Sequence, residues 1–169
     1  IPTIDRYVLP LDSSDKTEND FLRAHSRSHF DVIQNRLETL KSAGKTVTLS
    51  TTITAANAFS LPGIARFLKG YVRSGGKVHA WHLYRFIPEG RGGRVNASRL
   101  GLSEFTYTQA CKAATSLFLP FPVYRRKNMY RSSSVDFFWR LKGQWVNAHQ
   151  DRRLPQGNRA GSSLIMISR

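Results

Sequence analysis

Hydrophobic positions alternate between two patterns over the first 119 residues. Short runs rich in apolar and β-branched side chains, typical of strands, occupy 7–11, 45–54 and 78–87. After each run, apolar side chains recur every three or four residues, which predicts helices over about 20–43, 61–74 and 104–118. Strands that alternate with helices at this short spacing predict βαβ units with a parallel sheet and right-handed crossovers.

Turn and capping residues mark the ends of these predicted elements. Ser60 and Ser103 precede helical stretches and are suited to cap them, and Pro62 fits a first turn because no N–H donor is needed there. Gly44 suits the left-handed conformation that follows a helix C-terminus. The Gly- and Pro-containing stretch 88–93 predicts a loop after the third strand.

The pattern changes after residue 119, where Pro120 and Pro122 break the helical period. The segments that follow are a predicted β-hairpin (133–140 and 144–148), a polar and basic loop (149–161) and a stretch that is either a last short strand or an unstructured end (162–168). The sequence therefore predicts two parts: βα units over 1–119, and a basic C-terminal extension with a hairpin over 120–169.

Three parallel strands cannot close a barrel, because a closed βα barrel has eight. Two α/β architectures remain: an open domain with the hairpin on one edge, or part of a larger barrel. Ligand sites in both lie at the carboxyl ends of the strands. We therefore expect the functional residues within 12–14, 50–57 and 86–93.

The positive charge is concentrated in the second half of the chain. The net charge is +15; residues 1–89 hold 12 Lys+Arg against 8 Asp+Glu, and residues 90–169 hold 14 against 3. Polyanions such as nucleic acid are natural partners, although a basic surface that only aids solubility is the alternative. The basic residues that lie among Tyr124, Tyr130 and Trp145 are suited to an RNA or DNA surface, and they are Arg125, Arg126, Lys127, Arg152, Arg153 and Arg159.

Several classes of protein are excluded by what the sequence lacks. No run reaches the ~18–20 apolar residues of a membrane-spanning helix, so no membrane partner is expected. The single cysteine, Cys111, excludes an intrachain disulfide framework and is expected to be buried among alanines. No signal peptide is visible, which favours the cytoplasm. The chain lacks an initiator Met and enters a strand almost at once, which suggests a piece of a longer protein.

Two common catalytic arrangements have little support. His25 and His29 have the spacing of one helix face, but no third ligand completes a metal site, so no metal ligands are predicted. No G-x-S-x-G motif is present, so a hydrolase triad is not predicted. No catalytic residue is assigned.

Four short sequence motifs occur in a characteristic order along the chain. They are Leu11-Asp12-Ser13 with Arg23 and the helix phrase of 29–44; 47–54 with Asn57, Leu61, Ile64 and Leu68; 78–92 with Trp81, Leu83-Tyr84, Phe86-Ile87-Pro88 and Gly90-Arg91-Gly92; and Arg126, Met129, Tyr130 with 135–140. Over about 7–147, this order resembles the C-terminal half of a radical S-adenosylmethionine (SAM) domain. Among subfamilies, the chain is most similar to the viperin-like group of antiviral nucleotide-modifying enzymes.

The resemblance implies a partial (βα) barrel with parallel strands and a small C-terminal β extension. It also implies that SAM is a cofactor, and that the complete enzyme cleaves SAM to a 5′-deoxyadenosyl radical that abstracts hydrogen from a substrate. Arg23 would bind the SAM carboxylate. The ribose would meet either Ser50 and Thr52, which share one face of a strand, or Thr51, which lies on the other face. The alternatives are an exposed helix arginine and a Thr-rich strand selected for β propensity.

The other implied contacts surround adenine and the substrate. Tyr84 and Phe86 share a strand face with His82 and would flank adenine, although aromatic strand residues commonly belong to a core. Asn57 would bind the ligand or shape its loop. The substrate, a small molecule such as a nucleotide, would meet an anion-binding group of Arg91, Gly92, Arg94 and Arg126.

One departure from the family pattern concerns the iron–sulfur cluster. Radical SAM enzymes hold a [4Fe–4S] cluster on a CxxxCxxC motif, and this chain has one cysteine. The cluster would need ligands from a missing N-terminal segment or a partner subunit. The chain is thus a fragment, one half of a split enzyme, or a degenerate relative, and whether it is an enzyme stays open. The second hypothesis is a non-catalytic basic α/β module that binds nucleic acid or a protein partner.

Overall fold

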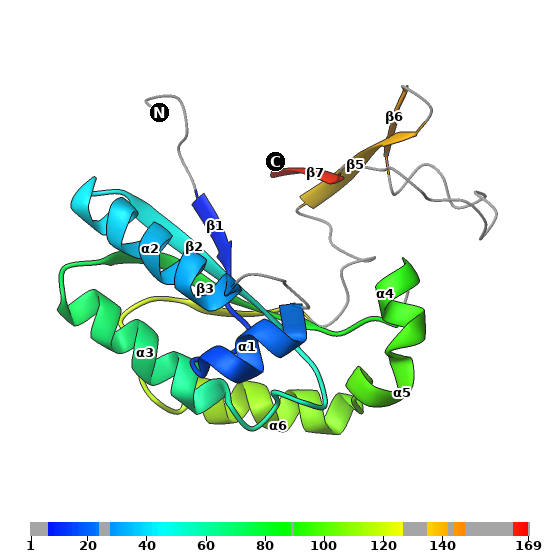
Figure 1. The fold of residues 1–169 in the computed structure, drawn as a ribbon, viewed down its shortest axis with the longest axis horizontal. Coiled ribbons are helices and arrows are strands. Elements are labelled where there is room, and N and C mark those ends of the chain that lie inside the picture. The colour runs from blue at the N-terminus through cyan, green and yellow to red at the C-terminus, as the bar shows by residue number, and fades with distance from the viewer. Residues whose placement is uncertain are drawn as a thin grey trace. The chain divides into compact units, whose positions relative to one another are not determined.

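The computed structural model describes residues 7–23, 28–88, 90–126, 135–141, 144–147 and 164–168. The chain divides into two compact units, Ile1–Lys127 and Asn128–Arg169 (Figure 1). The sequence placed this boundary between residues 119 and 120. The difference arises because a strand after Pro122 joins the first unit rather than the C-terminal extension.

The first unit contains a four-stranded parallel sheet. Its strands are β1 (Tyr7–Pro10), β2 (Thr46–Ile53), β3 (Lys77–Arg85) and β4 (Val123–Arg126), in the order β1-β2-β3-β4. The α/β class and three of the strands confirm the sequence prediction. The fourth strand was not predicted, because the two prolines before it suggested only a break.

Helices connect the strands. They are α1 (Lys16–Arg23), α2 (His29–Ser42), α3 (Leu61–Arg73), α4 (Gly90–Val95), α5 (Ala97–Leu100) and α6 (Glu104–Thr115). The prediction of one helix over about 20–43 is wrong, since the stretch contains the end of α1 and the whole of α2. The prediction of a loop over 88–93 is also wrong in part, since α4 begins at Gly90.

Capping contacts explain these helix boundaries. The Asp20 carboxylate accepts a hydrogen bond from the Phe30 N–H (2.8 Å), which satisfies a free donor in the first turn of α2. Ser103 caps α6 as predicted, with its hydroxyl accepting from the Thr106 N–H (3.0 Å). Ser60 precedes α3 but makes no capping bond, because its hydroxyl donates to Glu18 instead (2.8 Å). Gly44 has the expected positive φ, 65°.

The helices cover one face of the sheet, as sequential parallel strands with right-handed crossovers require, and α2, α3 and α6 lie together on this side in Figure 1. The core forms between these layers. Its fully buried strand residues include Val47, Leu49, Ile53, Trp81 and Leu83, and its fully buried helix residues include Ile33, Leu61, Ile64, Leu68 and Tyr107. On β2 and β3 the buried positions alternate with less buried ones from residue 49 and residue 81 onward.

The second unit is a three-stranded antiparallel sheet. Its strands are β5 (Val135–Leu141), β6 (Gln144–Asn147) and β7 (Leu164–Ser168), in the order β6-β5-β7. The predicted hairpin is confirmed, and of the two alternatives for 162–168 the structure has the strand. The predicted loop over 149–161 lies outside the described residues. Among the helices of the described segments, none combines the length and hydrophobicity needed to cross a bilayer.

Candidate functional site

The sheet face opposite the helices carries polar and aromatic side chains near the carboxyl ends of its strands. Parallel pairing aligns them in two rows across β2, β3 and β4: Ser50, His82 and Tyr124 in the first, and Thr52, Tyr84 and Arg126 in the second. Ser50, Thr52, His82 and Tyr84 are only partly buried, whereas the residues that alternate with them, Thr51, Ile53, Trp81 and Leu83, are fully buried; we call the face of the first set the open face. The sequence predicted that Ser50 and Thr52 share a face and that Thr51 lies on the other; the structure confirms this alternation.

Aromatic and cationic groups cluster on the open face. The His82 ring packs edge-on against Tyr124 (5.3 Å between centroids), and its Nδ1 lies 3.3 Å from the Tyr84 hydroxyl. The Arg126 guanidinium lies 5.4 Å from the centroid of the Tyr124 ring. Burial raises the pKa of the Tyr84 phenol, so this hydroxyl is protonated at neutral pH. The sheet thus brings together Tyr84 and Arg126, which the sequence assigned to different ligand groups.

Three hydroxyl side chains alternate along β2 toward the open face: Thr48, Ser50 and Thr52. Thr48 is buried, and its Oγ1 has no hydrogen-bond partner among the described residues. Ser50 and Thr52 are partly buried, and no side-chain hydrogen bond holds either hydroxyl in the part of the chain that the structure describes. The two partly buried hydroxyls, those of Ser50 and Thr52, suit a ligand that itself carries hydroxyls.

A hydrogen-bond network holds the loop after β1 against the end of β2. The Asn19 side chain accepts from the Asp12 N–H (3.0 Å), and Asn57 donates to the carbonyls of Asp12 (2.7 Å) and Thr52 (3.0 Å). The Asn57 amide oxygen accepts from the Thr54 N–H (2.8 Å). Asn57 is fully buried. Of its two predicted roles, the structure therefore shows the contacts of a residue that shapes its loop.

Asp12 and Arg23 form an ion pair at this carboxyl edge. The Asp12 Oδ2 lies 2.7 Å from Arg23 Nε, and its Oδ1 accepts from the Thr52 N–H (2.7 Å). The Asp12 side chain is 7% exposed and that of Arg23 is 28% exposed. Burial raises the pKa of the Asp12 carboxyl, while Arg23 and the Thr52 N–H act against this shift. Arg23 thus lies at the edge where the sequence predicted a ligand, and an internal carboxylate already holds it.

For the remaining predicted site residues, the structure shows fewer contacts with the open face. Phe86 follows β3 directly and is partly buried, with its N–H bonded to Ile53 O (2.9 Å). Arg94 is exposed near the end of α4. Nothing is described of the Arg91 side chain, and Gly92 has none, so the anion-binding role of these two residues stays a prediction.

The structure also shows site residues that the sequence did not assign. Asp12 lay in a segment predicted to be functional, but no role was assigned to it. His82 was noted only because it shares a strand face with Tyr84, and Tyr124 only because basic residues lie next to it in the sequence. The period-2 alternation of β3 is the signal that could have joined His82 to Tyr84. Tyr124 could not be placed without β4, which the sequence did not predict.

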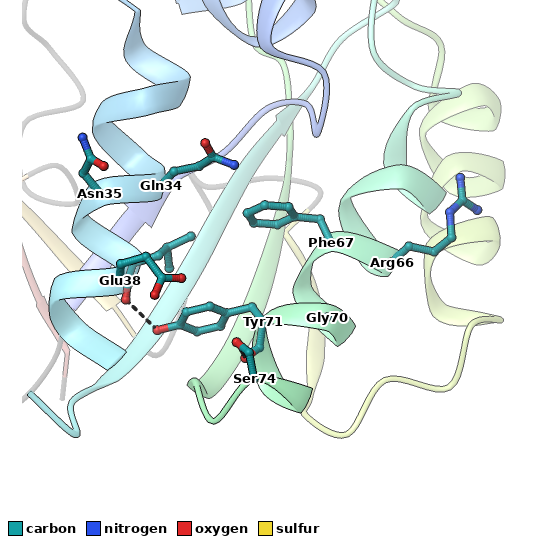
Figure 2. Close-up of a pocket in the computed structure, with 9 residues that line it drawn as sticks. Gln34, Asn35, Glu38, Arg66, Phe67, Gly70, Tyr71 and Ser74 are labelled. Atoms are coloured by element: carbon teal, nitrogen blue, oxygen red, sulfur yellow. Dashed lines mark hydrogen bonds between the residues drawn. The ribbon is translucent and has the colours of Figure 1, made fainter. Parts of the chain in front are cut away.

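A separate hollow of about 560 Å³ lies on the helix layer between α2 and α3. Figure 2 shows Phe67 and Tyr71 of α3 reaching toward α2, where the Tyr71 hydroxyl donates to Leu37 O (3.1 Å). Gln34, Glu38 and other polar side chains border it. None of the predicted site residues lines this hollow.

The residues present do not fit a [4Fe–4S] cluster. Three thiolates are required, and the chain has one cysteine. Cys111 is fully buried on α6, and burial raises the pKa of its thiol, which disfavours the thiolate form. Among the described residues, no group of three or more His, Cys, Asp or Glu side chains is placed to hold a metal ion.

Comparison with protein-family models gives no match for this chain, and comparison with curated proteins gives none either.

Proposed function

We propose that this chain is the SAM- and substrate-binding part of a cytoplasmic radical SAM enzyme of the viperin-like type, and that its parallel sheet is one wall of a partial (βα) barrel. The observation that supports this most is the open face. Ser50, Thr52 and Tyr84 lie there together near the carboxyl ends of sequential parallel strands, where βα folds bind ligands.

Each proposed contact has a physical basis. The Ser50 and Thr52 hydroxyls bind the ribose, because they lie on one strand face and have no internal hydrogen bond among the described residues. Tyr84 and Phe86 flank adenine, and Arg23 binds the carboxylate of the methionine part. An anionic substrate, such as a nucleotide, binds to a group of four residues: Arg91, Gly92, Arg94 and Arg126.

The ligands of the iron–sulfur cluster would come from another segment or from a partner subunit. A single buried cysteine cannot ligate it. The role of this chain is accordingly to bind and orient SAM and the substrate.

Titration of the chain with SAM in a calorimeter tests the proposal. Ser50→Ala and Thr52→Ala should each weaken SAM binding about three- to ten-fold, the effect of one lost hydrogen bond. Thr46→Ala is the matched control, because Thr46 is an exposed threonine at the opposite end of the same strand. Absence of SAM binding by the unaltered chain, or equal losses in all three variants, would contradict the proposal.

One observation favours the second hypothesis, a module that binds nucleic acid. Tyr124 is 43% exposed, with the Arg126 guanidinium against its ring. An aromatic ring next to a cation is suited to stack a base and neutralise a phosphate. Binding of a labelled single-stranded RNA that weakens steeply with salt and is lost in Tyr124→Ala, without any response to SAM, would favour this hypothesis over the first.

A further inference from the structure

Asp12 connects two residues that the proposed function places on the same ligand. One carboxylate oxygen accepts the Thr52 N–H (2.7 Å), and the other contacts Arg23 Nε (2.7 Å). Thr52 is proposed to bind the ribose and Arg23 the carboxylate. A single buried side chain therefore sets the position of the arginine relative to β2.

Arg23 requires such a contact because of its place in the fold. It is the last residue of α1, and its side chain is 28% exposed. A long side chain at a helix end loses rotamer freedom when a ligand fixes it, and this loss weakens binding. A contact that fixes it beforehand removes that cost.

The geometry of the ion pair leaves Arg23 able to bind a second carboxylate. Asp12 contacts the guanidinium through Nε. The two terminal nitrogens carry four further N–H donors, and they form the fork that binds a carboxylate through two bonds. Asp12 is itself fixed, since its backbone N–H is bonded to Asn19 and its carbonyl to Asn57.

We propose that Asp12 is a positioning residue that holds Arg23 for the carboxylate of the bound ligand and thereby makes the site selective for ligands that have this carboxylate. The inference rests on the proposed function, because it takes SAM as the ligand. It adds a specificity determinant that acts through Arg23 and touches no ligand atom.

Two related ligands separate this role from a merely structural one. SAM carries the methionine carboxylate, whereas 5′-methylthioadenosine has the same adenosine and sulfur but lacks the amino-acid part. A variant that damages the loop after β1 or the strand β2 should bind both ligands more weakly. A variant that only displaces Arg23 should bind SAM more weakly and 5′-methylthioadenosine normally.

The experiment compares binding of SAM and 5′-methylthioadenosine to the chain and its variants by calorimetry. Asp12→Asn should weaken the binding of SAM about ten-fold, as expected when a charge-assisted contact is displaced. Binding of 5′-methylthioadenosine should change less than about two-fold. Arg23→Ala should give the same selective loss, and the double variant should lose no more than either single one, because both act through one contact.

Arg66→Ala is the matched control. Arg66 is an exposed arginine on α3, so this variant removes the same charge away from the open face and should bind both ligands normally. Circular dichroism and thermal unfolding verify that each variant is folded. If Asp12→Asn does not fold, Asp12→Glu, which keeps the carboxylate, and Arg23→Gln carry the test.

The outcomes separate the inference from the proposed function. Equal weakening of both ligands in Asp12→Asn would overturn the positioning role, as would additive losses in the double variant. Equal binding of the two ligands by the unaltered chain would also overturn it, while leaving SAM binding intact. Binding of neither ligand would overturn the proposed function, and the inference with it.

Discussion

The two faces of the parallel sheet are built from the same strands and differ in what their residues contact. On the helix-covered face, Trp81 and Leu83 are fully buried, and the polar Thr51 is buried with both of its hydrogen-bonding capacities used. On the open face, His82 and Tyr84 are only partly buried. Neighbouring residues of one strand thus differ in burial: the fully buried set stabilises the fold, and the proposed function places the ligand on the side of the partly buried set.

Because the two faces differ in this way, substitutions on them should separate effects on the free energy of unfolding from effects on ligand affinity. A substitution on the covered face removes packing and satisfied hydrogen bonds, so it lowers the free energy of unfolding. A substitution of Ser50 or Thr52 on the open face removes no side-chain hydrogen bond among the described residues. If the open face binds a ligand, its substitutions should change affinity while the stability stays nearly constant.

The largest contrast is expected for two adjacent residues of β3. Trp81→Ala should lower the free energy of unfolding by about 3–5 kcal/mol, because it leaves a cavity in the core and removes the donor to Thr51. His82→Ala should cost less than about 1 kcal/mol. Urea unfolding followed by circular dichroism measures both. A loss from His82→Ala as large as that from Trp81→Ala would show that the open face is also packed.

A sharper contrast of intermediate size comes from two adjacent threonines. The Thr51 hydroxyl donates to Leu11 O (2.5 Å) and accepts from Trp81 Nε1 (2.8 Å), so Thr51→Val should cost about 1–3 kcal/mol by leaving buried polar groups unpaired. Thr52→Val keeps the backbone bond to Asp12 and should change stability by less than about 0.5 kcal/mol.

Urea unfolding and SAM titration of both threonine variants complete this comparison. Thr52→Val should weaken SAM binding, and Thr51→Val should leave it nearly unchanged wherever the variant is folded. The reverse assignment of stability and binding would mean that the two faces of β2 have been interpreted the wrong way round.

The contrast between the faces could be predicted from the sequence because it depends on local alternation. Ser50 and Thr52 had to share a face once β2 was recognised, and Thr51 had to lie on the other. The short strand β4 was not predicted, because Tyr124 and two arginines give no apolar alternation in a strand of four residues. The helix α4 was not predicted either, because Gly-rich sequences have low helix propensity.

The contacts of the carboxyl edge were beyond sequence reasoning for a different reason. Asp12 meets Arg23 across 11 positions of the sequence, and Asn57 meets the Asp12 carbonyl across 45. Such pairs depend on how the loop after β1 lies against β2. The sequence placed Asp12 and Asn57 after predicted strands and Arg23 in a predicted helix, but did not show that they would contact one another.

A smaller effect is expected at an exposed position of the helix layer. Gly70 lies within α3, and an added Cβ would meet no atom within 4 Å. Gly70→Ala should therefore raise the free energy of unfolding by about 0.5–1 kcal/mol through helix propensity. Gly76→Ala is the contrasting control, because its Cβ would collide with the Tyr71 ring and destabilise the protein. Thermal unfolding measures both, and destabilisation by Gly70→Ala would contradict the space assigned to it.

The smallest expected effect is the pH dependence of stability that arises from Asp12, in the loop after β1. Burial raises the pKa of Asp12 above its ordinary value of 3.8, with Arg23 opposing the shift. The native state then binds this proton more tightly than the unfolded state, so the Asp12 contribution to stability falls as pH rises from about 3.8 through the native pKa, and is constant above it.

Urea unfolding between pH 3.5 and 7, on the order of the carboxyl titration range, measures this step as the stability of the unaltered protein minus that of Asp12→Asn. Asp20 and Asp31, whose pKa values are lowered, lose their contributions as pH falls in both proteins, so they cancel in the difference. The difference should decrease with rising pH, and more steeply in an Arg23→Ala background, where the opposing charge is gone. A difference that increases with pH would mean that the ion pair outweighs burial, and that Arg23 holds the carboxylate more strongly than the buried position disfavours it.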